Sequence, residues 1–170
     1  MSHTFDKKSF DKNIKKILNV SNYQIVPKSK FLIDQISQYD VRLLIFTDFC
    51  YFLQNYGAIC EKHGSLATLS LNAPNDINSF IRELKKFYAV SESIIPFYWV
   101  GSDCLCFDTQ IKYGEHGCIK AWNHEMEKQI CPQDGISLFV NDKDERFQLY
   151  LFSDFIKIIA QYKSFPGIGI

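Results

Sequence analysis

Helical patterns stand near both ends of the sequence, with a run of short strand patterns between them, and this order most restricts the possible folds. In each terminal pattern, apolar residues recur at the spacing of one helix face. These residues are Phe10, Ile14, Ile17 and Leu18 in the first pattern, and Phe155, Ile158, Ile159 and Tyr162 in the last. Ser153 suits the N-cap of the last helix, and five lysines make the first helix basic.

Internal segments predict further helices. Thr47–Tyr56 carries its apolar residues on one face, with Thr47 as a candidate N-cap and Gly57 at the position that follows a helix end. The segment from Asn75 or Asp76 to Tyr88 keeps helical spacing over three turns, and Phe31–Tyr39 suits a short helix.

Strand patterns dominate the second half of the chain, separated by residues that favour turns. The expected strands are Leu66–Leu71, Ile94–Val100, Cys104–Thr109, Cys118–Trp122, Ile136–Val140 and Phe147–Leu151. Helices at both ends of consecutive strands predict a single α+β domain, with a mostly antiparallel sheet and helices on one of its faces.

The net charge of the chain restricts the kinds of partner that it can bind. Nineteen basic and nineteen acidic residues cancel, so the chain lacks the positive field that drives binding to a phosphate backbone, and we expect no nucleic-acid partner. The first ten residues contain no apolar stretch typical of a signal peptide or a membrane span. We therefore expect a cytoplasmic protein, no membrane partner, and six cysteines in the thiol form.

Cysteine and histidine cluster in the strand region, which raises the question of zinc. The residues concerned are Cys104, Cys106, His116, Cys118 and His124. Cys104 and Cys106 alternate along an expected strand instead of forming a knuckle, so core packing is the favoured interpretation and no metal or other cofactor is expected. Cys60 and His63 have knuckle spacing but no second pair. Pairs such as Asp103 with Asp108, or His124 with Glu125, suit acid–base chemistry, but solvated carboxylates explain them more simply.

Aromatic residues are numerous, with fifteen phenylalanines and nine tyrosines, and they suit either a dense core or an interface. Trp122 stands at the end of a strand, before His124 and Glu125, in a mixture of polar and aromatic residues typical of an interface rim or anchor. For Trp122 itself core packing is the favoured role, and its neighbours His124 and Glu125 are the better candidates for exposed contacts.

Three blocks resemble the SUKH superfamily, which includes yeast Smi/Knr-type regulators and bacterial immunity proteins. Thr47–Gly57 is similar to the family helix in which Phe-Leu precedes a turn with glycine. Ile95–Asp108 and Gly117–Glu125 look like the family strands, which close in Trp-x-His-Glu. Phe152–Ile156 is similar to the start of the terminal helix.

The resemblance implies a SUKH-like domain over residues 41–170, with residues 1–40 as a helical extension packed on it. It also implies a non-enzymatic protein that binds and neutralises a cognate polymorphic or contact-dependent toxin, many such toxins being nucleases. The expected partner contacts are Asp103, Asp108, Glu115, Trp122, His124 and Glu125. A regulatory scaffold of the Smi/Knr type is the alternative, followed by a small metal-dependent hydrolase.

Overall fold

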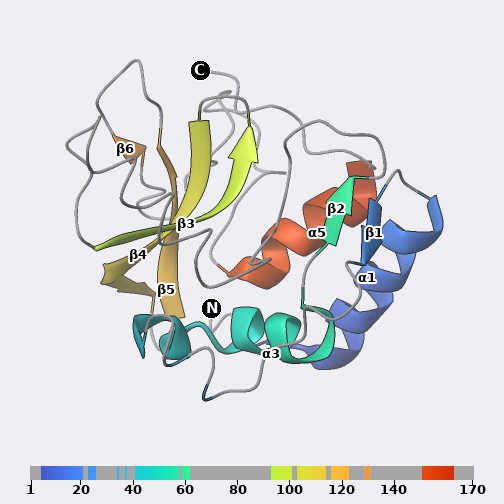
Figure 1. The fold of residues 1–170 in the computed structure, drawn as a ribbon, viewed down its shortest axis with the longest axis horizontal. Coiled ribbons are helices and arrows are strands. Elements are labelled where there is room, and N and C mark those ends of the chain that lie inside the picture. The colour runs from blue at the N-terminus through green and yellow to red at the C-terminus, as the bar shows by residue number, and fades with distance from the viewer. Residues whose placement is uncertain are drawn as a thin grey trace.

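The computed structural model describes residues 5–20, 23–25, 34, 37, 41–57, 59–61, 93–100, 103–113, 116–122, 129–130 and 151–162. Helices and strands are mixed along this part of the chain (Figure 1). The helices are α1 (Lys7–Val20), the 3₁₀ helix η1 (Val41–Ile45), α3 (Thr47–Asn55) and α5 (Phe152–Tyr162). The strands are β1 (Tyr23–Ile25), β2 (Ile59–Glu61), β3 (Ile94–Val100), β4 (Asp103–Tyr113), β5 (His116–Trp122) and β6 (Gln129–Ile130).

Two sheets are present among the described residues, and every strand pair in them is antiparallel. The larger sheet has the order β3-β4-β5-β6, so neighbours in sequence are neighbours in space. The smaller sheet pairs β1 with β2 and was not expected from the sequence. Predominantly antiparallel pairing therefore holds wherever the strands are described, and the chain is of mixed α and β structure.

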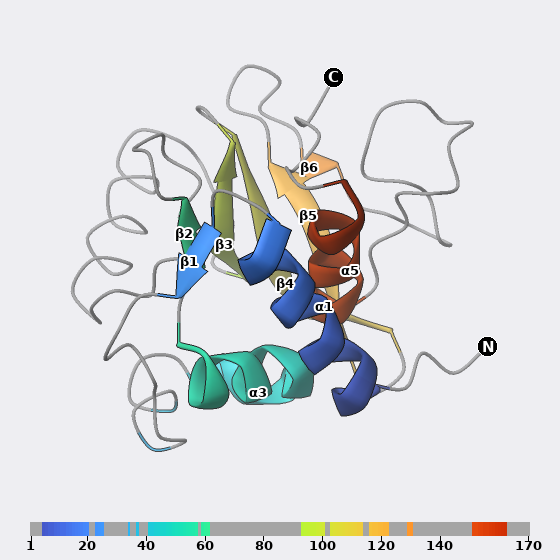
Figure 2. The same cartoon turned by 90° about the vertical axis from the view of Figure 1, so that its right-hand side faces the viewer.

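Helix α1 begins at a side-chain cap. The carboxylate of Asp6 accepts hydrogen bonds from the backbone N–H groups of Lys8, at 3.0 Å, and Ser9, at 3.3 Å. These groups would otherwise lack an acceptor in the first turn. The predicted apolar stripe faces the core: Phe10, Ile14 and Ile17 are buried, and the helix lies alongside α5 (Figure 2).

A β-bulge in strand β3 shapes the contact between the sheet and α5. The register with β4 shifts between Pro96 and Tyr98, which leaves Phe97 as the extra residue. A bulge re-aims side chains out of simple alternation. As a result two consecutive residues reach the same helix, and the rings of Phe97 and Tyr98 lie 5.4 Å and 4.9 Å from the ring of Phe155.

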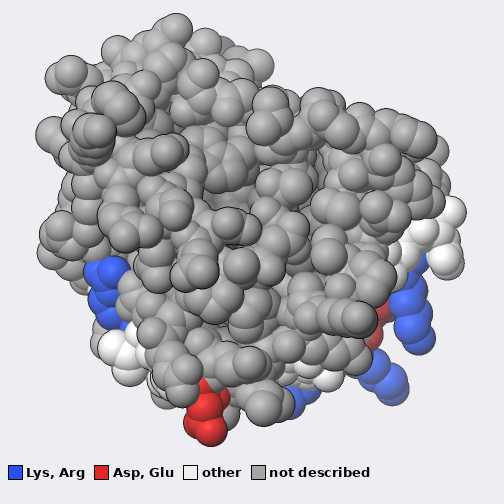
Figure 3. Space-filling view, in the orientation of Figure 1, with Lys and Arg blue, Asp and Glu red and all other residues white. Residues whose placement is uncertain are grey.

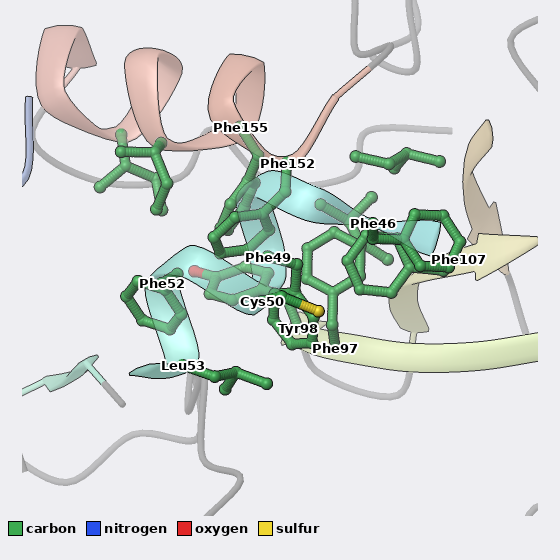
Figure 4. Close-up of a cluster of buried hydrophobic side chains, with 14 of the residues drawn as sticks. Phe46, Phe49, Cys50, Phe52, Leu53, Phe97, Tyr98, Phe107, Phe152 and Phe155 are labelled. Carbon is green, nitrogen blue, oxygen red and sulfur yellow. The ribbon is translucent and has the colours of Figure 1, made fainter. Parts of the chain in front are cut away.

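Phenylalanine is the most frequent residue of the described core (Figure 4). Phe49 of α3 lies at the centre, with ring centroids 4.8 Å from Phe107 of β4 and 4.8 Å from Phe152 of α5. Phe97 stacks on Phe107 at 4.4 Å. Aromatic rings bury large areas and gain further energy from edge and offset contacts, so this cluster holds α3, α5 and the sheet together.

Both hydroxyl caps predicted from the sequence are wrong. Helix α3 starts at Thr47, and the preceding Phe46 makes no side-chain cap bond. Helix α5 starts at Phe152, so Ser153 is its second residue. The cap positions are occupied by Phe46 and Leu151, whose side chains are apolar and buried. The backbone N–H groups in the first turns of α3 and α5 therefore need acceptors from other residues.

Aspartates take over the capping. The carboxylate of Asp154 accepts a hydrogen bond from the backbone N–H of Leu151 at 2.9 Å. Asp48, which is only 2% exposed, accepts from the N–H of Phe49 at 2.9 Å and, across the core, from the N–H of Ser153 at 2.7 Å. One buried carboxylate therefore serves the first turns of both α3 and α5.

Other predictions agree with the described elements or lie outside them. Gly57 follows α3 with a φ of 78°, the left-handed conformation that favours glycine after a helix. In the expected helix Phe31–Tyr39, Asp34 and Ser37 are described and both are helical. The expected elements Leu66–Leu71, Asn75–Tyr88 and Ile136–Val140 lie outside the described residues, as does Phe147–Leu151 except for its last residue. No helix in the described ranges combines the length and apolar character needed to cross a membrane.

Candidate binding surface

Two of the predicted contact residues come together at one end of the main sheet. Asp103 begins β4 and pairs with Val100 of β3. The next residue, Cys104, pairs with Trp122, the last residue of β5. The backbone positions of Asp103 and Trp122 are therefore near neighbours across the β4–β5 pair.

Asp108 differs from the other predicted contacts because the structure buries it. It pairs with Ile94 on one side and Cys118 on the other, and it is 2% exposed. Strand β4 carries three extra residues directly after it, between Asp108 and Lys112, relative to β5. A buried carboxylate in the central part of a sheet is not available to a docking partner, so we remove Asp108 from the contact set.

The remaining predicted contacts lie outside the described residues. These are Glu115, His124 and Glu125, and the side chain of Trp122 is likewise not described. Tyr113 and His116, which flank residues 114–115 in the sequence, pair with each other at the end of the β4–β5 hairpin far from Asp103. Because three residues of β4 are extra, strand β5 measures the separation: from His116 to Trp122 it has six steps, so at about 3.3 Å per residue the two ends of the hairpin lie roughly 20 Å apart.

The cysteines singled out in the sequence fit strand packing. Cys104 and Cys106 both lie in β4, and Cys106 is buried and takes part in no disulfide. Within the described ranges, no three His, Cys, Asp or Glu side chains gather closely enough to hold a metal ion.

Cys50 is a second buried free thiol, in α3, and the sequence patterns did not single it out. Its Sγ donates to the backbone carbonyl of Leu43 at 3.2 Å. Burial, together with the nearby carboxylate of Asp48, raises the pKa of Cys50 to about 11. Because the thiolate is the reactive form, Cys50 is a packing residue and not a nucleophile at neutral pH.

A polar cluster joins α1 to α3, and sequence reasoning missed it. The carboxylate of Asp11 accepts hydrogen bonds from the hydroxyl of Tyr56 at 2.5 Å and from that of Tyr51 at 3.1 Å. Burial and then the bond to Asp11 raise the pKa of both tyrosines, so both hydroxyls stay protonated as donors. Lys7 lies 5.3 Å from the centre of the Tyr51 ring. The cluster is a fixed link between helices, since its donors and acceptor are paired with one another.

The outer side of α1 carries exposed charge. Lys8, Lys12, Lys15 and Lys16 are all exposed, and we call these four residues the α1 lysine face. Figure 3, in the orientation of Figure 1, shows basic side chains projecting at the right-hand edge of the molecule, where α1 lies. Among the residues that the structure describes, the lysine face is the largest group of exposed like charges on one element.

No protein-family profile matches the chain, and a search of curated proteins found no significant match.

Proposed function

We propose that this chain is a protein-binding module of the SUKH type that acts, in a bacterium, as an immunity protein against a cognate toxin. The proposed module is a single cytoplasmic α+β domain over residues 41–170, with helices on one face of its sheet. The first forty residues form an extension packed on that domain.

One observation carries the proposal: aromatic residues from all three SUKH-like blocks pack on one another. Phe49 comes from the first block, Phe97 and Phe107 from the second, and Phe152 from the third. The ring centroids of Phe49 and Phe97 are 6.3 Å apart, and those of Phe97 and Phe152 are 5.6 Å apart. Segments about fifty residues apart in sequence thus contribute to one core, as a single domain built from these blocks requires.

The chemistry of the described residues also favours binding over catalysis. Cys50, a potential nucleophile, is buried with a raised pKa, and Asp48 is occupied as a helix cap. Asp11 is held by two tyrosine hydroxyls. These groups therefore act in packing and capping, which leaves recognition of a partner to the exposed charged surface and to the segment around Trp122.

Growth rescue tests the proposal. The C-terminal domain encoded by the gene next to this one is expressed from a tight promoter, with and without this chain. We expect the domain to arrest growth and this chain to restore it, while Phe49→Ala, which opens the core, abolishes the rescue. A neighbouring product that arrests growth equally in the presence of this chain would contradict the proposal. Binding to several unrelated cellular proteins, with no toxic neighbour, would point to a regulatory scaffold instead.

A further inference from the structure

The α1 lysine face forms one continuous stripe. At 100° per residue, Lys8, Lys12, Lys15 and Lys16 fall within about 100° of the helix circumference. From Lys8 to Lys16 the stripe is roughly 12 Å long, at 1.5 Å per residue. No described residue forms an ion pair with these four side chains, and Asn19 extends the same exposed side.

The opposite side of α1 fixes this stripe in place. Phe10, Ile14 and Ile17 are each at most 2% exposed and belong to the main core. The ring of Phe10 packs edge-on against Tyr51 at 5.9 Å and also contacts Phe152 at 6.2 Å. Since α1 is anchored by its apolar side and by Asp11, its lysines face outward on a rigid support, which lowers the ordering cost of binding a partner.

Charge is distributed unevenly although the net charge is zero. Helix α1 holds five lysines and one aspartate, so fourteen basic and eighteen acidic residues remain in the rest of the chain. The helix therefore carries a net charge of +4 and the remainder −4. A separated distribution of this kind orients an approaching charged partner even when the whole molecule is neutral.

We propose that the α1 lysine face is a docking surface for an acidic protein face, a patch rich in Asp and Glu. The inference rests on the proposed function, to which it adds the charge of the partner's surface. Lysine ammonium groups on successive turns pair with carboxylates that repeat at similar spacing. Complementary charge at the rim of an interface speeds association and fixes orientation.

Polyanions other than proteins fit this face less well. The stripe contains neither arginine, which pairs with phosphate through two parallel bonds, nor exposed aromatic rings on which bases could stack. Insertion of α1 into lipid is excluded because its apolar side is already buried.

Two matched double variants test the inference. K12Q/K16Q removes two charges from the lysine face, and K7Q/K157Q removes two exposed charges outside it. Binding of the folded full chain is measured for three probes: poly-L-glutamate, a 20-base-pair DNA duplex and phosphatidylserine vesicles. Measurements at about 10 mM and 150 mM salt report how much of the binding free energy is electrostatic, since the screening length falls from about 30 Å to 8 Å.

We expect poly-L-glutamate to bind most tightly of the three, with affinity that falls as salt rises. K12Q/K16Q should weaken this binding by about fivefold, because each exposed ion pair contributes only modestly, while K7Q/K157Q changes it less than about twofold. No binding of poly-L-glutamate, tighter binding of DNA or vesicles, or equal loss in the two variants would each overturn the inference. Growth rescue does not enter this comparison, so failure of the lysine face and failure of the immunity function remain distinguishable.

Discussion

Asp48 is the residue whose loss we expect to be most informative about the fold. Its carboxylate accepts two backbone hydrogen bonds, at 2.9 Å from Phe49 and at 2.7 Å from Ser153, and the second bond joins residues 105 positions apart. Replacement of Asp48 by Ala removes the acceptor for both N–H groups. The first turns of α3 and α5 then lose their common partner.

The expected loss in the free energy of unfolding follows from the two lost hydrogen bonds. A hydrogen bond to a charged group contributes about 1.5–3 kcal/mol, and the desolvation of the carboxylate, which Ala relieves, offsets part of this. We therefore expect Asp48→Ala to lower the free energy of unfolding by about 3 kcal/mol. Asp48→Asn keeps one acceptor oxygen and should lower it by about 1–2 kcal/mol.

Urea denaturation followed by circular dichroism measures these changes. Asp6→Ala is the matched control, because Asp6 also caps a helix through two N–H groups but is exposed, and it should cost only about 1 kcal/mol. Amide exchange adds a local signal. The Ser153 N–H should exchange faster in Asp48→Ala than the loss of global stability alone explains. If Asp48→Ala costs no more than Asp6→Ala, the shared cap is not what joins the two helices.

Three further predictions test the core, the helix link and the interface. Because the folded-state pKa of Cys50 is raised from 9.0 to about 11, the stability it contributes is present below pH 9 and is lost as the pH rises towards 11. Urea unfolding at pH 8 and pH 10.5 should show a steeper decline for the wild type than for Cys50→Ala, and parallel declines would contradict this. Tyr56→Phe removes the hydroxyl that donates to the carboxylate of Asp11. It should lower the free energy of unfolding by about 1 kcal/mol in the wild type but by almost nothing in an Asp11→Ala background, and a double-mutant cycle measures this coupling. Trp122→Ala should weaken partner binding by about 2 kcal/mol or more with folding retained if Trp122 is an interface anchor, whereas a loss of roughly 3–5 kcal/mol in stability would place it in the core.

Periodicity predicted the elements whose amphipathic pattern is local. The stripe of Phe10, Ile14 and Ile17 in α1 is buried as expected, and β3 has the predicted bounds, Ile94–Val100. Helix α3 ends at Asn55, just before the predicted Tyr56, and Gly57 follows with a positive φ. In each case the residues that determine the element lie within a few turns of one another, so the sequence alone suffices.

Features that depend on distant partners were not predictable in the same way. The β1–β2 pair joins Tyr23 to Glu61, and neither three-residue strand has enough residues to show alternation. The cap predicted at Ser153 failed because α5 begins one residue earlier, at Phe152, and the N–H of Ser153 is capped by Asp48, a residue in a different helix. Strand β4 is longer than expected because its pairing with β5 continues to Tyr113 beyond a register shift.

The candidate site was predicted only in part for the same reason. Asp103 and Trp122 are brought close by strand register. The sequence had placed Trp122 at the end of an expected strand and Asp103 in the turn just before another. Burial of Asp108 could not be inferred, because alternation along one strand does not reveal whether the second face of a sheet is covered. The lysines of α1 were visible in the sequence, but their outward placement on an anchored helix required the contacts of Phe10 and Asp11.

Titration of the purified chain into the purified C-terminal domain of the neighbouring gene product tests the proposed function most directly. Calorimetry gives the stoichiometry and affinity, and the toxic activity of the domain is assayed in the same mixtures. We predict a complex of one to one, with a dissociation constant in the nanomolar range or below, and loss of the toxic activity at equimolar chain. A domain that keeps its full activity in the presence of excess folded chain would contradict the account.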